Sequence, residues 1–515
     1  MSWHDGVESL ASARRAALEL GGPARIQRQH DAGKLTARER IDLLLDPGSF
    51  EEFGILADHA SRREALTDVS APADGVVTGV GTVSGRVTFV LAEDFTTLGG
   101  SVGRTGMRKR HRVRELAERE LAPIVYLLDG AGARAQEFVN AGWVGGEPFL
   151  QMARMSGVVP QVAAVLGPLA GDPALEVPLC DFKVMAKGNG MLAAAGPPLV
   201  AAATGVTVTK EELGGWRLHT RTTGTVDLAV DDDAAAIAAI RAYLGFVPGS
   251  CYELPPVSAP VAPVRPADDL LSLVPMSRKQ PYDMRDIIAC LVDGGGFFEL
   301  QPEYGKAVLV GLARIEGHVV GVQANQPKVR AGAFGAEESD KCLHFLQLCN
   351  AFHVPVLFLT DVPGLMVGAA AEANATLRRG MRMASVMAHM RTPTVSVLIR
   401  KAYGMGAVVM NGPGGNQSLT LAWPSTEFGA MPAHGGVAAA HRRTITTAED
   451  PSEAEAALER HYAALGDVVH AARAFDFDDL IDPRETRARV ARAFARARER
   501  QRTDLGPWRY GGILP

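Results

Sequence analysis

Two stretches of the sequence decide the fold: Pro-Ile-Val-Tyr-Leu-Leu-Asp-Gly-Ala-Gly at residues 123–132 and Pro-Val-Leu-Phe-Leu-Thr-Asp-Val-Pro-Gly at residues 355–364. Each has the pattern of a buried strand that ends in an acidic residue and a glycine turn. The second stretch lies 232 residues after the first. A chain that repeats such a unit at a fixed distance is expected to contain two copies of one fold.

Two further pairs of segments recur at nearly the same distance. Residues 76–87 parallel residues 308–319 at an offset of 232, and both place Ser-Gly or Glu-Gly between apolar runs. This is the pattern of a β-hairpin. Residues 160–171 parallel residues 393–404 at an offset of 233, and both end in glycine after a strand. Three matches in the same order predict a tandem duplication.

Each copy alternates continuous Val, Ile and Leu strands with helical stretches such as residues 339–352 and 378–390. Parallel strands that are buried on both faces have this composition, so the predicted fold class is α/β, twice over. Seven prolines between residues 248 and 275 fit an extended connection. We therefore predict an N-terminal domain at 1–250, a proline-rich connection at 251–275 and a C-terminal domain at 276–515.

The composition excludes several classes of protein. The 515 residues are 47% hydrophobic and carry a net charge of -5, so no overall field favours nucleic acid or an anionic membrane. The five cysteines form no Cys-x-x-Cys pair, and the N-terminus lacks the pattern of a signal peptide. We expect a reduced, cytoplasmic protein with no membrane segment.

The usual signatures of side-chain catalysis are absent from the sequence. It contains no Gly-x-Ser-x-Gly, His-Glu-x-x-His or phosphate-binding loop, and its histidines do not have the spacing of metal ligands, so we expect no metal. It does place glycine turns at Gly171-Asp172 and at residues 404–407, which are equivalent in the two copies. Backbone N–H groups at such turns can stabilise an oxyanion. A tight turn without a ligand is the alternative, but two equivalent turns favour a site for two carbonyl-bearing reactants.

Seven segments in one order then carry a resemblance that covers almost the whole chain. They are residues 34–50, 129–137, 324–328, 361–364, 400–404, 422–424 and 481–487. They resemble the carboxyltransferase (beta) subunits of biotin-dependent acyl-CoA carboxylases of the propionyl-CoA carboxylase type. The resemblance implies two crotonase-like (ClpP-like) domains, as the internal repeat does independently.

The resemblance also implies a function and its partners. Such a subunit moves CO2 from carboxybiotin to the α-carbon of a short-chain acyl-CoA, through an enolate that backbone donors stabilise. No Met-Lys-Met biotin attachment motif and no ATP-grasp signature occur, so biotin is expected on a biotin carboxyl carrier subunit, beside a separate biotin carboxylase. A homohexamer with sites between subunits is implied. The alternatives are a biotin-dependent decarboxylase, a transcarboxylase, a crotonase-type enzyme without biotin and a non-catalytic scaffold.

The site residues follow from the same resemblance. The first domain is expected to bind acyl-CoA and the second biotin. The implied catalytic residues are Gly171, Asp172, Met405 and Gly406; the implied substrate-binding residues are Gly132, Ala133, Arg134, Gly364 and Val408; and the implied biotin-binding residues are Gly404 and Ala407.

Two positions depart from the family pattern. Asp172-Pro173 replaces a Gly-Ala pair, and we expect only the Asp172 N–H to face the substrate while its side chain caps the following turn. Val408 replaces an acidic residue that senses acyl length, which leaves the acyl chain open and favours an aliphatic one.

Overall fold

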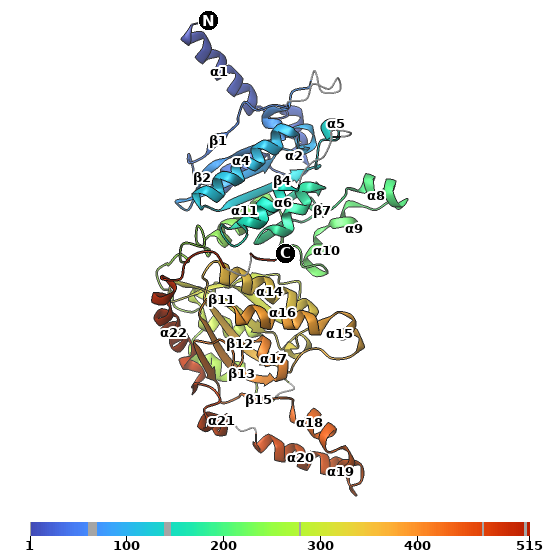
Figure 1. Cartoon of the computed structure of the whole chain (residues 1–515), viewed down its shortest axis with the longest axis vertical. Coiled ribbons are helices and arrows are strands. Elements are labelled where there is room, and N and C mark those ends of the chain that lie inside the picture. The colour runs from blue at the N-terminus through green and yellow to red at the C-terminus, as the bar shows by residue number, and fades with distance from the viewer. Residues whose placement is uncertain are drawn as a thin grey trace. The chain divides into compact units, whose positions relative to one another are not determined.

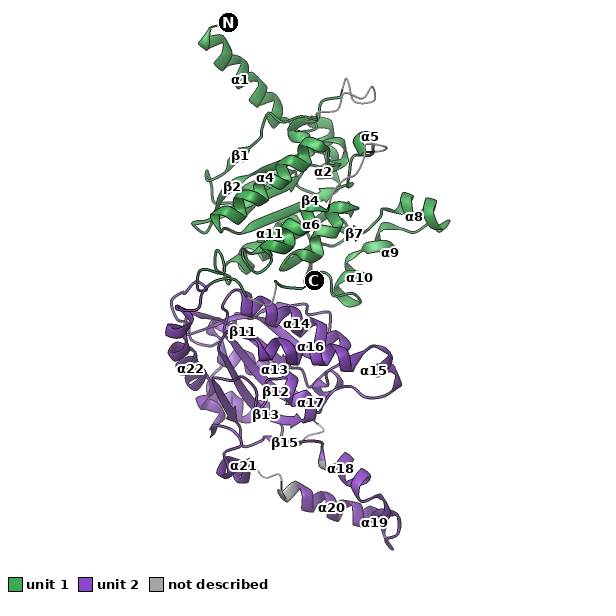
Figure 2. Ribbon diagram, viewed as in Figure 1, with its two compact units in different colours: residues 1–253, 506–515 green, residues 254–505 purple. Residues whose placement is uncertain are grey.

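The apolar run after Pro123 forms a fully buried strand, as expected of a strand with neighbours on both sides. The structure is a computed structural model that describes residues 2–59, 69–138, 146–277, 280–465, 468–508 and 512–514. It divides into two units, each of which builds its own sheet (Figure 2). Unit 1 comprises residues 1–253 and 506–515, and unit 2 comprises residues 254–505.

Unit 1 contains eight strands among its described residues. They are β1 (Glu51–Phe53), β2 (Val76–Val83), β3 (Arg86–Glu93), β4 (Ile124–Gly130), β5 (Gln161–Ala170), β6 (Phe182–Ala186), β7 (Met191–Ala193) and β8 (Leu228–Val230). Its helices are α1 (Trp3–Leu18), α2 (Pro23–Asp31), α3 (Ala37–Leu44), α4 (Arg104–Glu120), α5 (Ala135–Phe138), α6 (Glu147–Met155), α7 (Asp172–Glu176), α8 (Pro197–Thr204), α9 (Lys210–Gly214), α10 (Trp216–Arg221) and α11 (Asp233–Leu244).

Unit 2 contains another eight strands within the described part of the chain. They are β9 (Phe298–Leu300), β10 (Val308–Ile315), β11 (His318–Asn325), β12 (Val356–Val362), β13 (Thr394–Tyr403), β14 (Leu419–Ala422), β15 (Glu427–Gly429) and β16 (Asp479–Leu480). Its helices are α12 (Leu270–Leu273), α13 (Met284–Leu291), α14 (Ala336–Ala351), α15 (Ala369–Ala373), α16 (Thr376–Ala388), α17 (Gly404–Val409), α18 (Ala433–Ala440), α19 (Arg442–Thr446), α20 (Pro451–Leu465), α21 (Val468–Ala474) and α22 (Thr486–Gln501).

The two sheets have the same topology, which confirms the predicted duplication. Their strand orders are β1-β2-β3-β4-β5-β6-β8 and β9-β10-β11-β12-β13-β14-β16, and β7 and β15 pair with β5 and β13 respectively. The first two pairings of each sheet are antiparallel and the rest are parallel. The hairpins turn at Ser84-Gly85 and Glu316-Gly317, where all four residues have positive φ. This is the two-residue turn that fits the twist of the strands.

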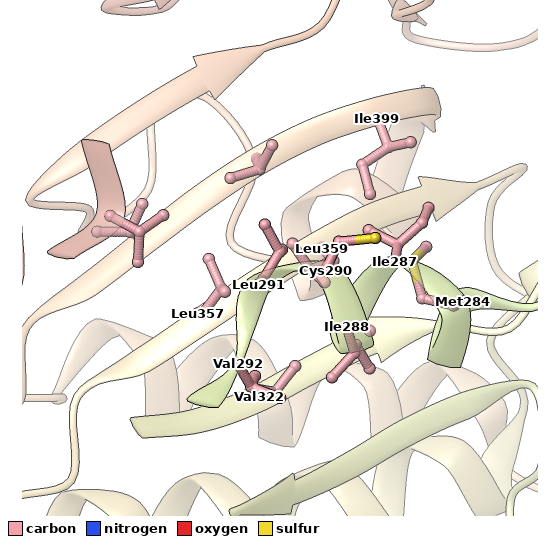
Figure 3. Close-up of a cluster of buried hydrophobic side chains, with 14 of the residues drawn as sticks. Met284, Ile287, Ile288, Cys290, Leu291, Val292, Val322, Leu357, Leu359 and Ile399 are labelled. Carbon is pink, nitrogen blue, oxygen red and sulfur yellow. The ribbon is translucent and has the colours of Figure 1, made fainter. Parts of the chain in front are cut away.

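Helices cover both faces of each sheet, so the strands are buried from two sides. In unit 1, α4 packs on β2 and β3, while α3 and α11 pack on β3 and β6. In unit 2, Met284, Ile287, Ile288 and Leu291 project from α13 onto the sheet residues Val322, Leu357, Leu359 and Ile399 (Figure 3). This layering explains the unbroken apolar strands read from the sequence.

The C-terminal residues belong to unit 1, although the sequence placed them at the end of the second domain. Ser156 and Ile513 hold them there: the Ile513 N–H donates to the Ser156 Oγ at 2.9 Å, and that hydroxyl donates to the Ile513 carbonyl at 3.2 Å. Trp508 is also buried.

Helical extensions follow the short strands β7 and β15. Figure 1 shows α8 to α10 and α18 to α20 lying beside the sheet layers rather than on them. Among the described residues, no helix is both long and apolar enough to cross a membrane.

Candidate active site at the carboxyl ends of the strands

The first candidate site lies where β4 and β5 of unit 1 end. A turn follows β4 at Gly132, whose φ is 85°, and the Val102 N–H donates to the Gly132 carbonyl at 2.8 Å. Val102 and Ala133 form an isolated parallel β-bridge. In this bridge the Ala133 N–H points away from Val102, and it donates to no backbone carbonyl of the described residues. β5 is followed by Gly171, with φ 74°, and Asp172 begins α7. Its N–H has no intrahelical acceptor, because the first N–H groups of a helix never do.

These two turns touch each other. A Cβ atom at Gly132 would overlap with the carbonyl oxygen of Ala170, so the close approach requires glycine. Ala133 and Asp172 line the same cavity. The turns that follow two neighbouring strands therefore border one space, and backbone N–H groups at such turns can stabilise a developing oxyanion.

Unit 2 repeats the first turn with the same hydrogen bonds. The Phe334 N–H donates to the Gly364 carbonyl at 3.2 Å, and the Met366 N–H donates to the Phe334 carbonyl at 2.7 Å. The Leu365 N–H of unit 2 is therefore equivalent to the Ala133 N–H of unit 1. Leu365 was not among the residues predicted from the sequence, but the offset of 232 leads directly to it.

The second turn of unit 2 begins α17. Gly404 has a φ of 52°, and a Cβ there would lie 2.8 Å from the Ala430 carbonyl oxygen. A Cβ at Gly406 would lie 2.7 Å from the Gly364 Cα, so the two turns of this unit also touch. Met405 lies in the first turn of α17, where its N–H has no intrahelical acceptor.

The remaining predicted residues of α17 lie further along the helix. Ala407 is half-buried, and Val408 is exposed on the surface of unit 2. Their assignment to biotin and to the acyl chain stays a prediction.

A buried carboxylate ties the two turns of unit 2 together. Asp361, in β12, accepts hydrogen bonds from the Lys401 backbone N–H at 3.1 Å and the Tyr282 hydroxyl at 2.8 Å, and it pairs with the Arg400 guanidinium at 3.1 Å. Burial, and next the charge of Asp361, raise the pKa of Tyr282, so the hydroxyl stays a donor at neutral pH. Asp361 lies shortly before the turn at Gly364. Its cationic partners Arg400 and Lys401 lie in β13, shortly before α17. The Asp361 carboxylate therefore connects the two turns.

Unit 1 has the equivalent carboxylate but takes its cations from elsewhere. Asp129 pairs with the Lys34 Nζ at 2.8 Å and with the Arg40 guanidinium at 2.9 Å. Gly167 stands at the position equivalent to Arg400, and a Cβ there would overlap with the Asp129 carboxylate. Burial lowers the pKa of Lys34, while Asp129 acts to raise it. The N-terminal segment therefore supplies the positive charge that β13 supplies in unit 2.

Arg134 supports its loop from inside the protein. Its side chain is buried, with Nη1 2.5 Å from Asp74 and 2.8 Å from Glu137, and Nη2 donates to the Ser101 carbonyl at 2.8 Å. All of this guanidinium is engaged within unit 1, where it orders the loop that carries the Ala133 N–H. The assignment of Arg134 to substrate binding stays a prediction.

Asp172 does not cap the turn that follows it, so that prediction is wrong. The N-cap of α7 is Gly171, and no side chain caps the helix, because Asp172 already occupies the first helical position. Its half-buried carboxylate forms no hydrogen bond or ion pair with any residue that the structure describes. Asp172 lines the same cavity as Ala133.

A buried charge network lies behind this cavity. The Arg110 guanidinium contacts Glu93 at 2.7 Å and Glu176 at 2.5 Å, and Arg114 also contacts Glu176 at 2.5 Å. The Glu93 carboxylate accepts the backbone N–H of Asp129 at 2.9 Å, which connects the network to β4. Burial raises the pKa of Glu93 to about 7, despite its pairing with Arg110.

A basic groove of about 570 Å³ lies near the same strand ends in unit 1. Its lining includes Pro168 of β5 and Phe95 after β3. Three of its cations, Arg25, Arg28 and Lys210, have no carboxylate partner among the described residues. The sequence did not predict this groove, because segments far apart along the chain form it.

Comparison with known proteins agrees with this architecture. Residues 28–511 match the carboxyl transferase domain family. The chain is 39% identical to the propionyl-CoA carboxylase beta chain of Roseobacter denitrificans, over 99% of both chains. It is 35% identical to the methylmalonyl-CoA decarboxylase subunit alpha of Propionigenium modestum, over 98% of both.

A solved structure has the same fold over almost the whole chain. It is a transcarboxylase 12S hexamer with methylmalonyl-coenzyme A and methylmalonic acid bound, with a TM-score of 0.91, 34% identity, and coverage of 97% of this chain and 96% of that one. The chain therefore belongs to the carboxyl transferase family, as a carboxyltransferase subunit of the acyl-CoA carboxylase type.

Proposed function

We propose that this chain transfers a carboxyl group from carboxybiotin, carried on a separate protein, to the α-carbon of a short-chain acyl-CoA. The duplicated pair of donor turns is the observation that carries the proposal. Each unit has two backbone N–H groups at touching turns, Ala133 with Asp172 and Leu365 with Met405. The reaction has two oxygens on which negative charge develops, one on the acyl thioester and one on the ureido group of biotin.

Unit 1 is the side we assign to acyl-CoA. Coenzyme A carries a pyrophosphate and a further phosphate, which need cations that are not already paired. The basic groove offers Arg25, Arg28 and Lys210, which have no described carboxylate partner, beside the apolar ring of Phe95. We assign one ligand to the groove and to the donors of Ala133 and Asp172, because Pro168 of β5 lines the groove and the same strand leads into the turn at Gly171.

Unit 2 is the side we assign to biotin. Gly404, Met405, Gly406 and Ala407 begin α17, and Leu365 completes the donor pair. Carboxybiotin, when bound, supplies both the carboxyl group and the base for the α-proton. The residues of this chain then have to hold two oxygens, orient the reactants and exclude water.

The proposed reaction also requires partner proteins. We assign the loading of biotin to a separate biotin carboxylase and its delivery to a biotin carboxyl carrier subunit. By analogy with the hexamer of transcarboxylase 12S, we also propose a homohexamer in which unit 1 of one subunit faces unit 2 of another.

Decarboxylation of methylmalonyl-CoA by the purified chain, with free biotin added, tests this function. We expect turnover that requires biotin. A scaffold would give no turnover, and a crotonase-type enzyme would not need biotin. ATP-dependent fixation of bicarbonate with candidate partner subunits then distinguishes a carboxylase from a decarboxylase or a transcarboxylase, which run the same half-reactions in other directions.

A further inference from the structure

A small cavity in unit 1 has no assigned role. Its volume is about 40 Å³, and it lies between α4, α6 and α7. Its lining includes Val102, Met107 and Phe149, together with Ala133 and Asp172. Ala133 and Asp172 also carry the two donors that we propose for the thioester oxygen, so the cavity adjoins that part of the proposed site.

The walls of the cavity suit an alkyl group and not an anion. Val102, Met107 and Phe149 provide apolar surface. The two arginines of the lining, Arg110 and Arg114, are both paired with carboxylates of the buried network. An entering anion would therefore find no free cation in this lining.

We infer that this cavity receives the alkyl chain on the α-carbon of the acyl group and limits the length of that chain. The inference rests on the proposed function, because it places the thioester oxygen on the Ala133 and Asp172 N–H groups. A water molecule needs roughly 10–15 Å³ of such volume. The cavity therefore holds a group of about one to three heavy atoms, which fits the chains of propionyl- and butyryl-CoA and excludes long acyl chains.

The same chemistry fixes which substituent enters. After carboxylation the α-carbon bears both an alkyl group and a new carboxylate. The cavity accepts the alkyl group, because Val102, Met107 and Phe149 provide apolar surface, and it excludes the carboxylate, because burial of a charge without a partner is unfavourable. The carboxyl group must then arrive from the open side, so propionyl-CoA is expected to give one configuration at the α-carbon.

Two substitutions from different helices test the chain-length limit. Met107→Ala on α4 and Phe149→Ala on α6 both enlarge the cavity, and both side chains are half-buried, so either change leaves the core intact. Leu150→Ala is the matched control, since Leu150 is the next residue of α6 and is 61% exposed. The readout is kcat/KM for biotin-dependent decarboxylation of malonyl-CoA derivatives that carry methyl, ethyl and butyl groups.

We expect each enlarging variant to raise the butyl-to-methyl ratio of kcat/KM by at least about tenfold, the usual effect of a methylene group in a fitted pocket. Leu150→Ala should change that ratio less than about twofold. An unchanged ratio in active Met107→Ala and Phe149→Ala proteins would overturn the inference and leave the proposed function standing.

A calorimetric titration with acetyl-, propionyl- and hexanoyl-CoA separates the two ideas further, because it needs no turnover. The wild-type chain could fail to decarboxylate methylmalonyl-CoA and still bind acyl-CoA more weakly as the acyl chain lengthens. If Met107→Ala then restores the affinity for hexanoyl-CoA, the cavity assignment is supported and the proposed carboxyl transfer is not. Equal affinities of wild type and Met107→Ala for hexanoyl-CoA would contradict the cavity assignment.

Discussion

At the scale of single residues, the proposed chemistry depends on backbone atoms, which side-chain signatures do not reveal. The four donors that we propose for the two sites are the backbone N–H groups of Ala133, Asp172, Leu365 and Met405. Any residue except proline supplies such a donor, so its position depends on the turn that presents it. The glycines beside the donors are the part that sequence can show, because a Cβ at Gly132 or Gly406 would collide with the facing turn.

Met405→Pro tests one donor directly. Proline removes the N–H but is tolerated in the first turn of a helix, and Met405 follows the first residue of α17. Loss of one oxyanion donor typically reduces kcat by about 10²–10³. We expect that loss in biotin-dependent decarboxylation, whereas Met405→Ala, which keeps the N–H, should stay within about threefold of wild type. Equal activities of the two variants would exclude the Met405 N–H as a donor.

The pKa of Glu93 predicts a dependence of stability on pH. Burial raises this pKa from 4.5 to about 7, so the folded protein binds more protons than the unfolded chain between those values. The contribution of Glu93 to the free energy of unfolding is therefore present below pH 4.5 and is lost as the pH rises to about 7. Glu93→Gln removes this titration. Urea unfolding should show that the free energy of unfolding decreases less between about pH 5 and about pH 8 in the variant than in the wild type. Equal decreases in the two proteins would contradict the raised pKa of Glu93.

At the scale of secondary-structure elements, each site depends on how two neighbouring strands are held in register. The carboxylates of Asp129 and Asp361 do this in both units, but the cations reach them by different routes. In unit 2, Arg400 and Lys401 belong to the adjacent strand itself. Removal of the Asp361 charge should therefore disturb both turns of that site together.

Asp361→Asn is the variant that separates positioning from folding. Asparagine keeps the shape and can still accept the Lys401 N–H, but it leaves the buried Arg400 guanidinium without its anion. We expect kcat of biotin-dependent decarboxylation to fall by at least about tenfold, with KM for the acyl-CoA little changed, because unit 1 is intact. A rise in that KM with unchanged kcat would show that Asp361 does not position the donors of unit 2.

Most elements of the fold were predictable from the sequence, and the exceptions have physical causes. The strands and hairpins were found because their apolar runs and turn residues recur at one offset. The capping role of Asp172 was predicted wrongly, since the glycine before it already ends the strand and caps α7. Leu365 was missed because a backbone donor needs no particular side chain. The basic groove was missed because Arg25 and Lys210 meet only in the folded chain.

At the scale of the whole molecule, several apolar side chains are exposed among the described residues. On α1, Trp3 is 92% exposed, and Val7 and Leu10 follow it on the same face of the helix. None of the residues of α8 is buried, although most are apolar, and Leu199 is 63% exposed. Helices of this kind need a second surface to cover them, because exposed apolar area is unfavourable in water.

The last prediction concerns the assembly that would cover these surfaces. We expect light scattering to give a mass close to six chains of 54.6 kDa. Leu199→Glu places a charge on α8 where an apolar contact is proposed, so it should shift the distribution to smaller species. If each site joins unit 1 of one subunit to unit 2 of another, activity must fall with the fraction of hexamer. A stable monomer of Leu199→Glu with wild-type kcat/KM would contradict a site that two subunits share.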